Sequence, residues 1–165
     1  MNQSPPETEQ DPAFDRNAFV VPVERVAATL ILCDGSRHEV LMPRGPGQPI
    51  ADVFEAREPF LPAQEAGAMR LFARAALACI AIDSGALERV SLIEIDDSEL
   101  PELERPVSVQ LAGGVVLQGG LRFVKVHGRG RISDVLNEPT ASFALHVGTR
   151  VHHIAKAHVL TIDER

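Results

Sequence analysis

Short runs of apolar residues, separated by glycines and polar positions, make up most of the chain after about residue 20. The clearest pattern lies at residues 107–111, where Val, Val and Leu alternate with polar residues before Gly113 and Gly114 interrupt the run. Apolar residues then resume and continue to position 126. Alternation with a period of two on both sides of a glycine pair is typical of a β-hairpin.

The segment that follows predicts three more short strands. Gly119 and Gly120 interrupt the second strand, where we expect a bulge or a sharp bend. Residues 132–137 fit either a strand or one helical turn capped by Ser133 or Asp134. After residue 143, apolar runs separated by Gly148 and by the small residues near 155–157 bring the total to about five strands.

The first half of the chain repeats this order of landmarks, which predicts two copies of one fold. The spacing from Gly35 to Asp52 is close to that from Gly114 to Asp134, and the length differences fall where loops are expected. The matched landmarks are residues 32–35 with 111–114, 50–54 with 132–136, Phe60 with Phe143, 72–75 with 154–157, and Ile80 with Ile162.

One segment gives conflicting signals. Residues 68–82 are rich in Ala, Leu, Met and Arg, which favour a helix, but their partners in the second copy have a strand pattern. Because a repeated fold constrains the chain more strongly than local propensity does, we predict that residues 68–82 are mostly β.

The predicted fold is therefore mostly β, with two tandem five-stranded small β-barrels, a pseudo-twofold repeat and short helical turns. Composition and charge complete the division of the chain. It consists of an acidic, proline-rich disordered tail at 1–19, repeat 1 at 20–83, an acidic linker at 84–106 and repeat 2 at 107–165.

Charge is unevenly distributed over the 165 residues. The formal net charge is −7, but residues 107–165 carry +3 and residues 84–106 carry −5. The acidic total disfavours non-specific binding to nucleic acid or membranes by the whole molecule. The absence of Trp and Tyr removes the usual aromatic stacking platforms.

The second copy resembles the Sm-like small β-barrels. The resemblance lies in residues 109–121, a glycine-bent hairpin, and in residues 154–162, which read Ile-Ala-Lys-Ala-His-Val-Leu-Thr-Ile. Residues 131–137 with Phe143 also resemble the centre of a bacterial domain of unknown function. The resemblance implies a curved barrel with edge-strand pairing between barrels and, less directly, RNA binding.

The positions that bind RNA in Sm-like proteins are not preserved. Such proteins carry Asp and Asn in the loop after the second strand and Arg-Gly in the last turn, whereas this chain has Lys125 and His127 in the loop and Lys156 with alanine in the turn. The loop still holds three cations that could contact phosphates. The tentative binding residues are Lys125, His127, Arg129, Arg131 and Lys156.

Other groups point to structure rather than chemistry. Asp52 and Asp134 recur in both copies, which favours a cap or a turn hydrogen bond. The two cysteines, Cys33 and Cys79, lie in apolar surroundings and are expected to be reduced, buried thiols. The histidines near residues 152–158 lack the spacing of a metal site, and no catalytic motif is present. We expect no metal, no cofactor and no catalytic residue.

These patterns favour a non-enzymatic bacterial adaptor for protein interaction or regulation. Its partner would be a protein, or a second copy of the chain bound through strand edges. The alternative is an Sm-like RNA-binding regulator that uses the basic loop of the second repeat. No signal peptide and no long apolar run is evident, so we expect a cytoplasmic protein without a membrane partner.

Overall fold

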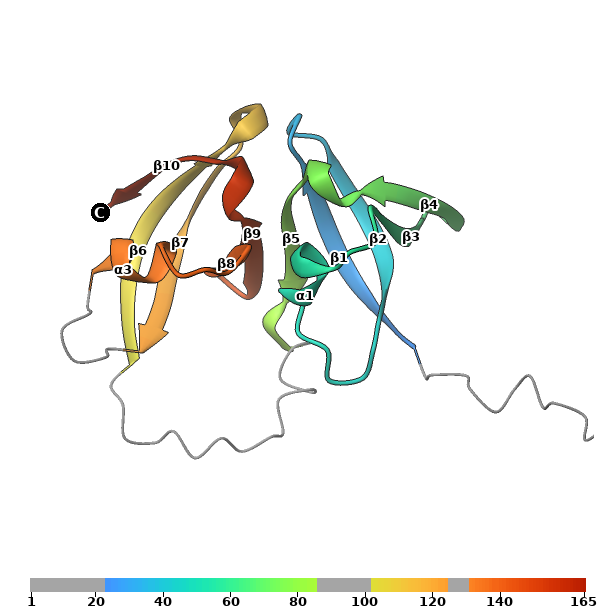
Figure 1. The fold of residues 1–165 in the computed structure, drawn as a ribbon, viewed down its shortest axis with the longest axis horizontal. Helices are drawn as coiled ribbons and strands as arrows, with labels where there is room; N and C mark the ends of the chain where they lie inside the picture. Colours follow the sequence, from blue (N-terminus) through green and yellow to red (C-terminus); the bar gives the residue numbers. More distant parts are fainter. Residues whose placement is uncertain (1–22, 86–101, 125–130) are drawn as a thin grey trace, which may run out of the picture.

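The computed structural model describes residues 23–85, 102–124 and 131–165 (Figure 1). Two stretches of this chain have the same order of elements: two strands, a short helix, two strands, a 3₁₀ turn and a last strand. In the first unit they are β1 (Glu24–Leu32), β2 (Arg37–Arg44), α1 (Asp52–Glu55), β3 (Phe60–Glu65), β4 (Ala68–Ala73), η1 (Arg74–Ala76) and β5 (Leu77–Asp83).

In the second unit the 3₁₀ turn η2 (Ala112–Gly114) is added to this order, at the tip of the first hairpin. The elements are β6 (Glu102–Leu111), η2, β7 (Val116–Val124), α3 (Ile132–Leu136), β8 (Ser142–Val147), β9 (Arg150–Ala155), η3 (Lys156–His158) and β10 (Val159–Glu164). The described chain is mostly β, as predicted. None of its helices is long and apolar enough to cross a bilayer.

All ten strands form one antiparallel sheet in the order β10-β6-β7-β8-β9-β5-β1-β2-β3-β4. The sheet is not closed into two barrels, which corrects the prediction. Closing the first unit would require its end strands, β4 and β5, to pair with each other. Instead, the outer edge of β5 pairs with β9 of the second unit, so the two units share one sheet.

The relation between the units also differs from the predicted pseudo-twofold. A twofold axis would bring like strands together, because such an interface uses the same surface on both sides. Here the fifth strand of the first unit, β5, pairs with the fourth strand of the second unit, β9. The units are therefore joined head to tail, and Figure 1 shows them side by side with β5 and β9 between them.

The landmark glycines occupy equivalent turns of the two leading hairpins. Gly35 has φ +86° and Gly114 has φ +80°, a conformation that glycine adopts without steric cost. Each turn is closed by a matching backbone hydrogen bond, from Leu32 N–H to Ser36 in the first unit and from Leu111 N–H to Val115 in the second.

The landmark pair Phe60 and Phe143 is wrong by one position. Phe60 lies opposite Ala73 in its hairpin, whereas Phe143 lies opposite Ile154, the residue equivalent to Phe72. The residue equivalent to Phe143 is therefore Leu61, and both are buried, while Phe60 is 50% exposed. A one-residue shift in a strand moves a side chain to the other face of the sheet.

Residues 68–82 form strands, as predicted against their helical propensity. They comprise β4, the turn η1 and most of β5, whose residues Leu77–Ile82 are all buried. When a strand is covered on both faces, the space for its side chains is limited. This explains the small residues Ala78, Cys79 and Ala81 in the centre of β5. The alanines reflect the central position of β5 in the sheet.

The second unit begins earlier than the charge pattern predicts. Strand β6 starts at Glu102, inside the segment assigned to the linker. Leu103 packs against the core, while Glu104 lies on the exposed face and forms an ion pair with Arg122 at 3.0 Å. The alternation of apolar Leu103 with charged Glu104 is therefore that of a strand with one buried face and one solvent-exposed face.

Two hydrophobic clusters make up the core. One is built from the first unit around Leu30, Met42 and Phe72, and the other from the second unit around Leu111, Phe143 and Ile154. The second cluster also includes Ile31, Ala78 and Cys79 from the first unit. The two cores therefore meet where the units join.

The glycine pair in β7 marks a close approach between strands. A Cβ atom at Gly119 would lie 2.2 Å from the carbonyl oxygen of His146, and one at Gly120 would lie 2.0 Å from the Glu104 carboxylate. The register between β7 and β8 is Gly120 with His146. Gly119 thus allows β8 to approach β7 closely, and Gly120 leaves room for the Glu104 side chain of β6.

Candidate functional site

The pairing of β5 with β9, here called the junction, is the best-defined contact between the units. The partners in register run from Cys79 with Ile154 to Asp83 with Arg150. Beyond the strands, the backbone N–H of Ser84 donates to the carbonyl of Thr149 at 2.9 Å. Because every pair joins residues far apart in the chain, the junction fixes the arrangement of the units.

Arg150 ties the junction to the next strand of the first unit. Its guanidinium donates to Thr29 Oγ1 at 2.6 Å and to the carbonyl of Ala81 at 3.2 Å. The Thr29 hydroxyl in turn donates to the Glu39 carboxylate at 2.7 Å. A cation, a hydroxyl and a carboxylate therefore form one chain of hydrogen bonds across β9, β1 and β2.

The junction also holds a buried thiol and a buried imidazole. The Cys79 Sγ and His152 Nδ1 atoms are 3.6 Å apart. Burial raises the pKa of the Cys79 thiol to about 12 and lowers the pKa of His152 to about 4. At neutral pH the pair is therefore a protonated thiol and a neutral imidazole, which lacks the thiolate needed for nucleophilic chemistry.

His153 lies next to this pair on β9, opposite Ile80. Burial, reinforced by the nearby His146, Arg44 and His152, lowers its pKa to about 4. Two neighbouring histidines of the junction are thus uncharged at neutral pH. His158 also contacts the first unit, where its Nε2 atom lies 2.8 Å from the carbonyl oxygen of Ala75.

The tips of the two leading hairpins touch each other, as seen near the upper edge of Figure 1. A Cβ atom on Gly113 would lie 2.3 Å from the backbone N of Gly35, and one on Gly35 would lie 2.7 Å from the carbonyl oxygen of Gly113. Side chains at either position would force the tips apart.

Most of the predicted basic loop, including Lys125, His127 and Arg129, lies outside the described residues. Of the tentative binding residues, the structure describes Arg131 and Lys156. Arg131 is exposed and precedes α3. Lys156 instead holds the loop after that helix, since its Nζ donates to the Glu138 carbonyl at 2.7 Å and to Thr140 Oγ1 at 3.0 Å.

The first unit has an equivalent of Lys156. Arg74 occupies the same position in η1, and its guanidinium donates to the carbonyl of Val53 in α1 at 2.7 Å. A cation in this position therefore ties the last turn to α1 in the first unit and to the loop after α3 in the second, a structural role that engages the Lys156 amine.

The two recurring aspartates differ in their contacts. Asp134 accepts a hydrogen bond from the backbone N–H of Arg131 at 3.2 Å, so it caps the start of α3. Asp52 occupies the equivalent position at the start of α1, which has no side-chain cap hydrogen bond. The predicted capping role thus holds for one of the two residues.

Neither the histidines nor the cysteines form a metal site in the described part of the chain, where no group of three or more ligating side chains is found. Both thiols are free. Cys79 is buried as predicted, but Cys33 is only partly buried because it lies at the end of the β1–β2 hairpin.

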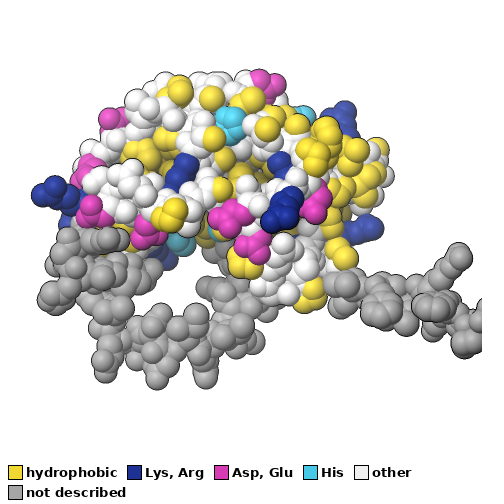
Figure 2. Space-filling model, viewed as in Figure 1, with side chains coloured by type: hydrophobic (Ala, Val, Ile, Leu, Met, Phe, Trp, Pro, Cys, Tyr) yellow, Lys and Arg dark blue, Asp and Glu magenta, His cyan; other side chains and the backbone are white. Residues whose placement is uncertain are grey.

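Apolar side chains are exposed at the opposite end of the sheet from β10. Figure 2 shows a gathering of hydrophobic side chains at the side of the molecule where β3 and β4 lie. The exposed fractions are 65% for Met69 and 67% for Leu71. We call the exposed apolar residues of this side, Leu41, Phe60, Met69 and Leu71, the β3–β4 face.

The outer edge of β4 has no strand partner within the described ranges, since β4 pairs on its other side with β3 alone. The strand equivalent to β4 in the second unit is β9, where Val151 takes the place of Met69 and His153 that of Leu71. Val151 is 5% exposed because β5 covers its strand. The β4 edge thus has the same place in its unit as the covered edge of β9.

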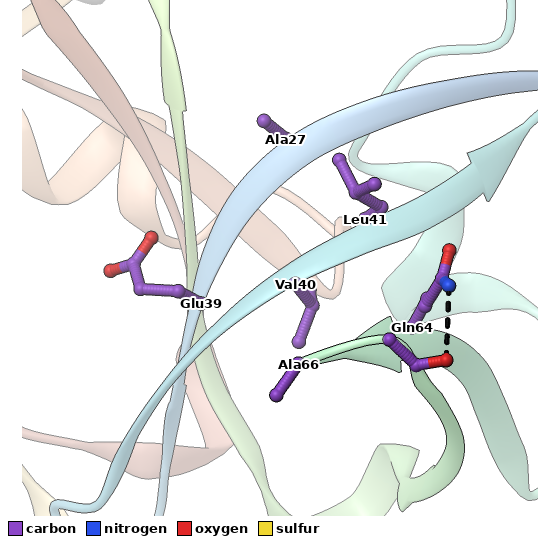
Figure 3. Close-up of a pocket in the computed structure, with 7 residues that line it drawn as sticks. Ala27, Glu39, Val40, Leu41, Gln64 and Ala66 are labelled. Atoms are coloured by element: carbon purple, nitrogen blue, oxygen red, sulfur yellow. Dashed lines mark hydrogen bonds between the residues drawn. The ribbon is translucent and has the colours of Figure 1, made fainter.

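A groove of about 470 Å³ lies beside this face, between β2 and the β3–β4 turn (Figure 3). Its lining includes Leu41 of the β3–β4 face, together with Ala27, Val40 and Gln64. The Gln64 amide donates to the carbonyl of Gly67 at 3.2 Å, which is the bond drawn in Figure 3. The groove adjoins the β3–β4 face at Leu41 and has the Glu39 carboxylate in its lining.

A smaller cavity of about 200 Å³ opens on the second unit between α3, β8 and β10. It is lined by Leu136, Phe143, Val159 and Ile162, with the Lys156 side chain at its border. Since the Lys156 amine already bonds to the α3–β8 loop, the cavity offers an apolar depression with few polar groups to orient a ligand.

The other end of the sheet is formed by β10, which pairs with β6 and has no second strand partner in the described chain. Its exposed residues are Leu160, Thr161, Asp163 and Glu164. Leu160 is 62% exposed. Figure 1 shows β10 and β4 at opposite ends of the molecule.

No family model, no curated protein and no solved structure matches the chain. The features that bear on function are therefore the two strand edges, the β3–β4 face and the junction.

The sequence predicted contacts through strand edges but did not indicate which strands, β4 and β10, would form the edges. A usable signal was present in β4, where Met69 and Leu71 alternate with Arg70 and the buried Phe72. Apolar residues on both faces of a short strand indicate either two-sided burial or an exposed apolar face. Only the order of the strands shows that the second case applies to β4.

Proposed function

We propose that this protein is a non-enzymatic adaptor that binds other protein chains by strand addition at the edge of β4. The observation that carries the proposal is a strand edge that has no partner among the described residues, combined with the exposed apolar side chains Met69 and Leu71 on the same strand. A strand added at this edge would gain backbone hydrogen bonds and an apolar surface to pack against.

The composition of β4 is unusual for a strand edge that no other described strand covers. Proteins commonly protect such edges with proline, charged residues or bulges, because an apolar edge invites pairing with other chains. β4 has one charge, Arg70, whose guanidinium lies 2.5 Å from the Glu65 carboxylate. The remaining residues of the strand are Ala, Met, Leu, Phe and Ala. This composition favours an edge that is used for binding.

The proposal includes the Sm-like character of each unit. It is supported by the five-strand order, by the closely packed glycines in the second strand of the second unit and by the 3₁₀ turn before the last strand. We place the protein in the cytoplasm, where free thiols such as those of Cys33 and Cys79 remain reduced.

Capture from a lysate of the source cells tests the adaptor role. Full-length chain should retain a reproducible set of proteins, and Leu71→Lys should reduce their retention at least roughly tenfold, because a charge on the added strand's packing surface opposes burial. Val116→Lys is the matched control, since Val116 is 52% exposed on β7, away from β4.

Equal capture by all three chains would overturn a role for β4. RNA is the competing outcome. Retention that nuclease removes, that weakens with added salt and that Arg131→Ala reduces while Leu71→Lys does not would replace the adaptor with an RNA-binding protein.

A further inference from the structure

A hydroxyl, an imidazole and a carboxylate lie in one row of contacts in the first unit. Ser36 directly precedes β2, His38 lies in β2 and Glu65 ends β3. The Ser36 Oγ atom is 3.3 Å from His38 Nε2, and His38 Nδ1 is 2.8 Å from Glu65 Oε1. We call these three side chains the Ser36 cluster.

The order of the groups defines the role of each ring nitrogen. A carboxylate only accepts hydrogen bonds, so the Nδ1 atom of His38 carries the proton that is donated to Glu65. In the neutral ring, the Nε2 atom then holds a lone pair and faces the Ser36 hydroxyl. His38 is therefore placed to take the hydroxyl proton.

The imidazole is held from two sides. The hydrogen bond with His38, supported by the charge of Arg70, keeps the pKa of Glu65 below its usual value, so Glu65 is a carboxylate at neutral pH. Arg70 Nη1 lies 2.5 Å from Glu65 Oε2, the oxygen that His38 does not use. The His38 ring also makes an edge contact with Phe72, with the ring centroids 5.2 Å apart.

The Ser36 cluster is shielded but remains open to solvent. The side chains of His38 and Glu65 are 19% and 20% exposed, and Ser36 is partly buried. A small reactant can therefore reach the hydroxyl, while the imidazole and the carboxylate keep a fixed geometry.

The fold does not require polar groups at these positions, as the second unit shows. The Val115 carbonyl accepts a hydrogen bond at the hairpin turn as the Ser36 carbonyl does. The equivalents of Ser36, His38 and Glu65 are, in order, Val115, Leu117 and Val147. All three equivalents pack in or against the core cluster of the second unit. Because apolar packing serves equally well there, a polar cluster in the first unit indicates function rather than stability.

We propose that Ser36 is a nucleophile that accepts acyl groups from activated esters, with His38 as its general base and Glu65 as a positioning residue. A nucleophile within hydrogen-bond reach of a base that a third group orients is the arrangement found at activated serines. The inference goes beyond the proposed function, since it adds a covalent modification site to the adaptor.

The reaction transfers one acyl group and needs no further reactant. The Ser36 Oγ atom attacks the carbonyl carbon of the ester while its proton passes to His38 Nε2. The tetrahedral intermediate then collapses, the bond from the carbonyl carbon to the leaving oxygen breaks, and His38 gives the proton to that oxygen. The products are acylated Ser36 and a free alcohol. Glu65 stabilises the imidazolium that exists between the two proton transfers.

Asp34 competes with His38 for the hydroxyl proton. Its Oδ1 atom accepts hydrogen bonds from Ser36 Oγ at 2.6 Å and from the Ser36 backbone N–H at 2.8 Å. These hydrogen bonds lower the pKa of Asp34, so its carboxylate is charged at neutral pH. The charge holds the hydroxyl and opposes the negative charge that develops during attack. Asp34→Asn keeps an oxygen for the turn and removes the charge.

Acetylation by p-nitrophenyl acetate tests the proposal. Release of p-nitrophenol gives the rate, and tandem mass spectra of peptides locate the acetyl group and separate Ser36 from Cys33. Ser84→Ala is the matched control, because the Ser84 hydroxyl donates to the carbonyl of Thr149 at 2.8 Å. His38→Leu copies the second unit, so the fold should tolerate it. Circular dichroism and thermal melting verify that every variant folds.

The full chain and Ser84→Ala should both be acetylated at Ser36, and Ser36→Ala should lose this label. His38→Leu should slow acetylation of Ser36 at least roughly a hundredfold, the contribution of a general base. Glu65→Gln should slow it at least roughly tenfold and move the pH midpoint of the rate downwards, because the imidazolium loses its counter-charge. Asp34→Asn should increase the rate.

Three results would overturn the proposal. If p-nitrophenyl acetate labels other residues of the full chain and leaves Ser36 unmodified, Ser36 is not activated. Acetylation of Ser36 at the same rate in a folded His38→Leu variant would make the hydrogen bonds purely structural. Loss of the label in Asp34→Asn, with an unchanged pH midpoint in Glu65→Gln, would assign the base to Asp34. Protein capture at β4 is measured separately, so the adaptor role does not depend on these outcomes.

Discussion

Glycine has two different tasks at the tip of the β6–β7 hairpin. Gly113 and Gly114 both have positive φ, at +76° and +80°, which costs a residue with a side chain about 1–2 kcal/mol. Around Gly114 no atom lies within 4 Å of the position a Cβ would take, whereas at Gly113 the backbone N of Gly35 is 2.3 Å away. One glycine is needed for the turn and the other also for contact between the units.

This difference predicts unequal effects of the same substitution. Gly114→Ala should lower the free energy of unfolding by about 1–2 kcal/mol, the cost of the backbone conformation alone. Gly113→Ala should cost at least roughly 1 kcal/mol more, because its methyl group also forces the hairpin tips apart. Urea unfolding of the two variants and the parent measures both values. Equal losses of unfolding free energy in the two variants would show that the contact between the hairpin tips does not contribute to stability.

Single residues also show which structural roles can be predicted from local sequence and which cannot. Gly35 and Gly114 could be predicted as turn positions because a glycine after an alternating run has a local cause. Phe60 was misplaced because burial depends on strand register, and a neighbouring leucine fills the core position as well as a phenylalanine does. The role of Lys156 depends on the position of the loop after α3, which local sequence does not reveal.

At the scale of the elements, β9 combines a central place in the sheet with two ionisable side chains. His152 and His153 have pKa values lowered to about 4 by burial, with Arg150 and Arg37 acting on the former and His146 and Arg44 on the latter. The usual pKa of an unfolded histidine is about 6.5. Between these values the folded strand excludes protons that the unfolded chain binds.

Stability should therefore decline as the pH falls from about 6.5 towards 4. The unfolded state takes up protons that the folded state does not, and each histidine contributes at most about 1.4 kcal/mol per pH unit. Above pH 6.5 both states are neutral at these positions and the contribution is constant. Urea unfolding at pH 7.5, 6.0 and 5.0 measures the slope.

His153→Leu provides the matched variant, since leucine is the equivalent residue in the first unit at position 71. It should reduce the slope between pH 6 and 5 by about 1.4 kcal/mol per pH unit at most, leaving the contribution of His152. A slope unchanged by this substitution would assign the acid sensitivity to other groups.

The strands themselves were largely predictable, and their partners were not. Residues 68–82 were correctly assigned to strands because the second unit supplied a comparison that outweighed the alanines. The helix at α3 remained open between two possibilities, since five residues are too few for a helical period to be recognised. The pairing of β5 with β9 has no local signal, because it joins segments more than 65 residues apart.

At the scale of the whole molecule, the shared sheet and the shared core should make the two units unfold together. Ile31, Ala78 and Cys79 of the first unit pack into the cluster of the second, so separating the units would expose residues that are 1% exposed or less. Losing this burial destabilises both units at once. A single cooperative transition is expected rather than two independent ones.

The thiol of Cys79 reports on this coupling. It is buried in the junction, and its pKa is raised to about 12, so both access and ionisation oppose its reaction with a thiol reagent. In the native protein at pH 8, Cys33 should react first and Cys79 at least roughly a hundredfold more slowly. In urea beyond the transition the two rates should become similar.

Cys33→Ser isolates the slow thiol, and its reaction should follow the urea dependence of global unfolding. Rapid native labelling of Cys79 in this variant would mean that the units separate without unfolding. The arrangement of the whole molecule would then be a mobile one rather than one rigid sheet.

The junction has a further consequence for how the chain is made. β5 ends at Asp83 and its cover, β9, ends at Ala155, so 72 more residues must be synthesised before the edge of β5 can be covered. At about 5–20 residues per second this takes about 4–14 s. Throughout that interval the first unit of a nascent chain exposes the edges of both β4 and β5. The β9 strand of one chain could then cover the β5 edge of a neighbouring chain made on the same messenger RNA, so that the two chains exchange their second units.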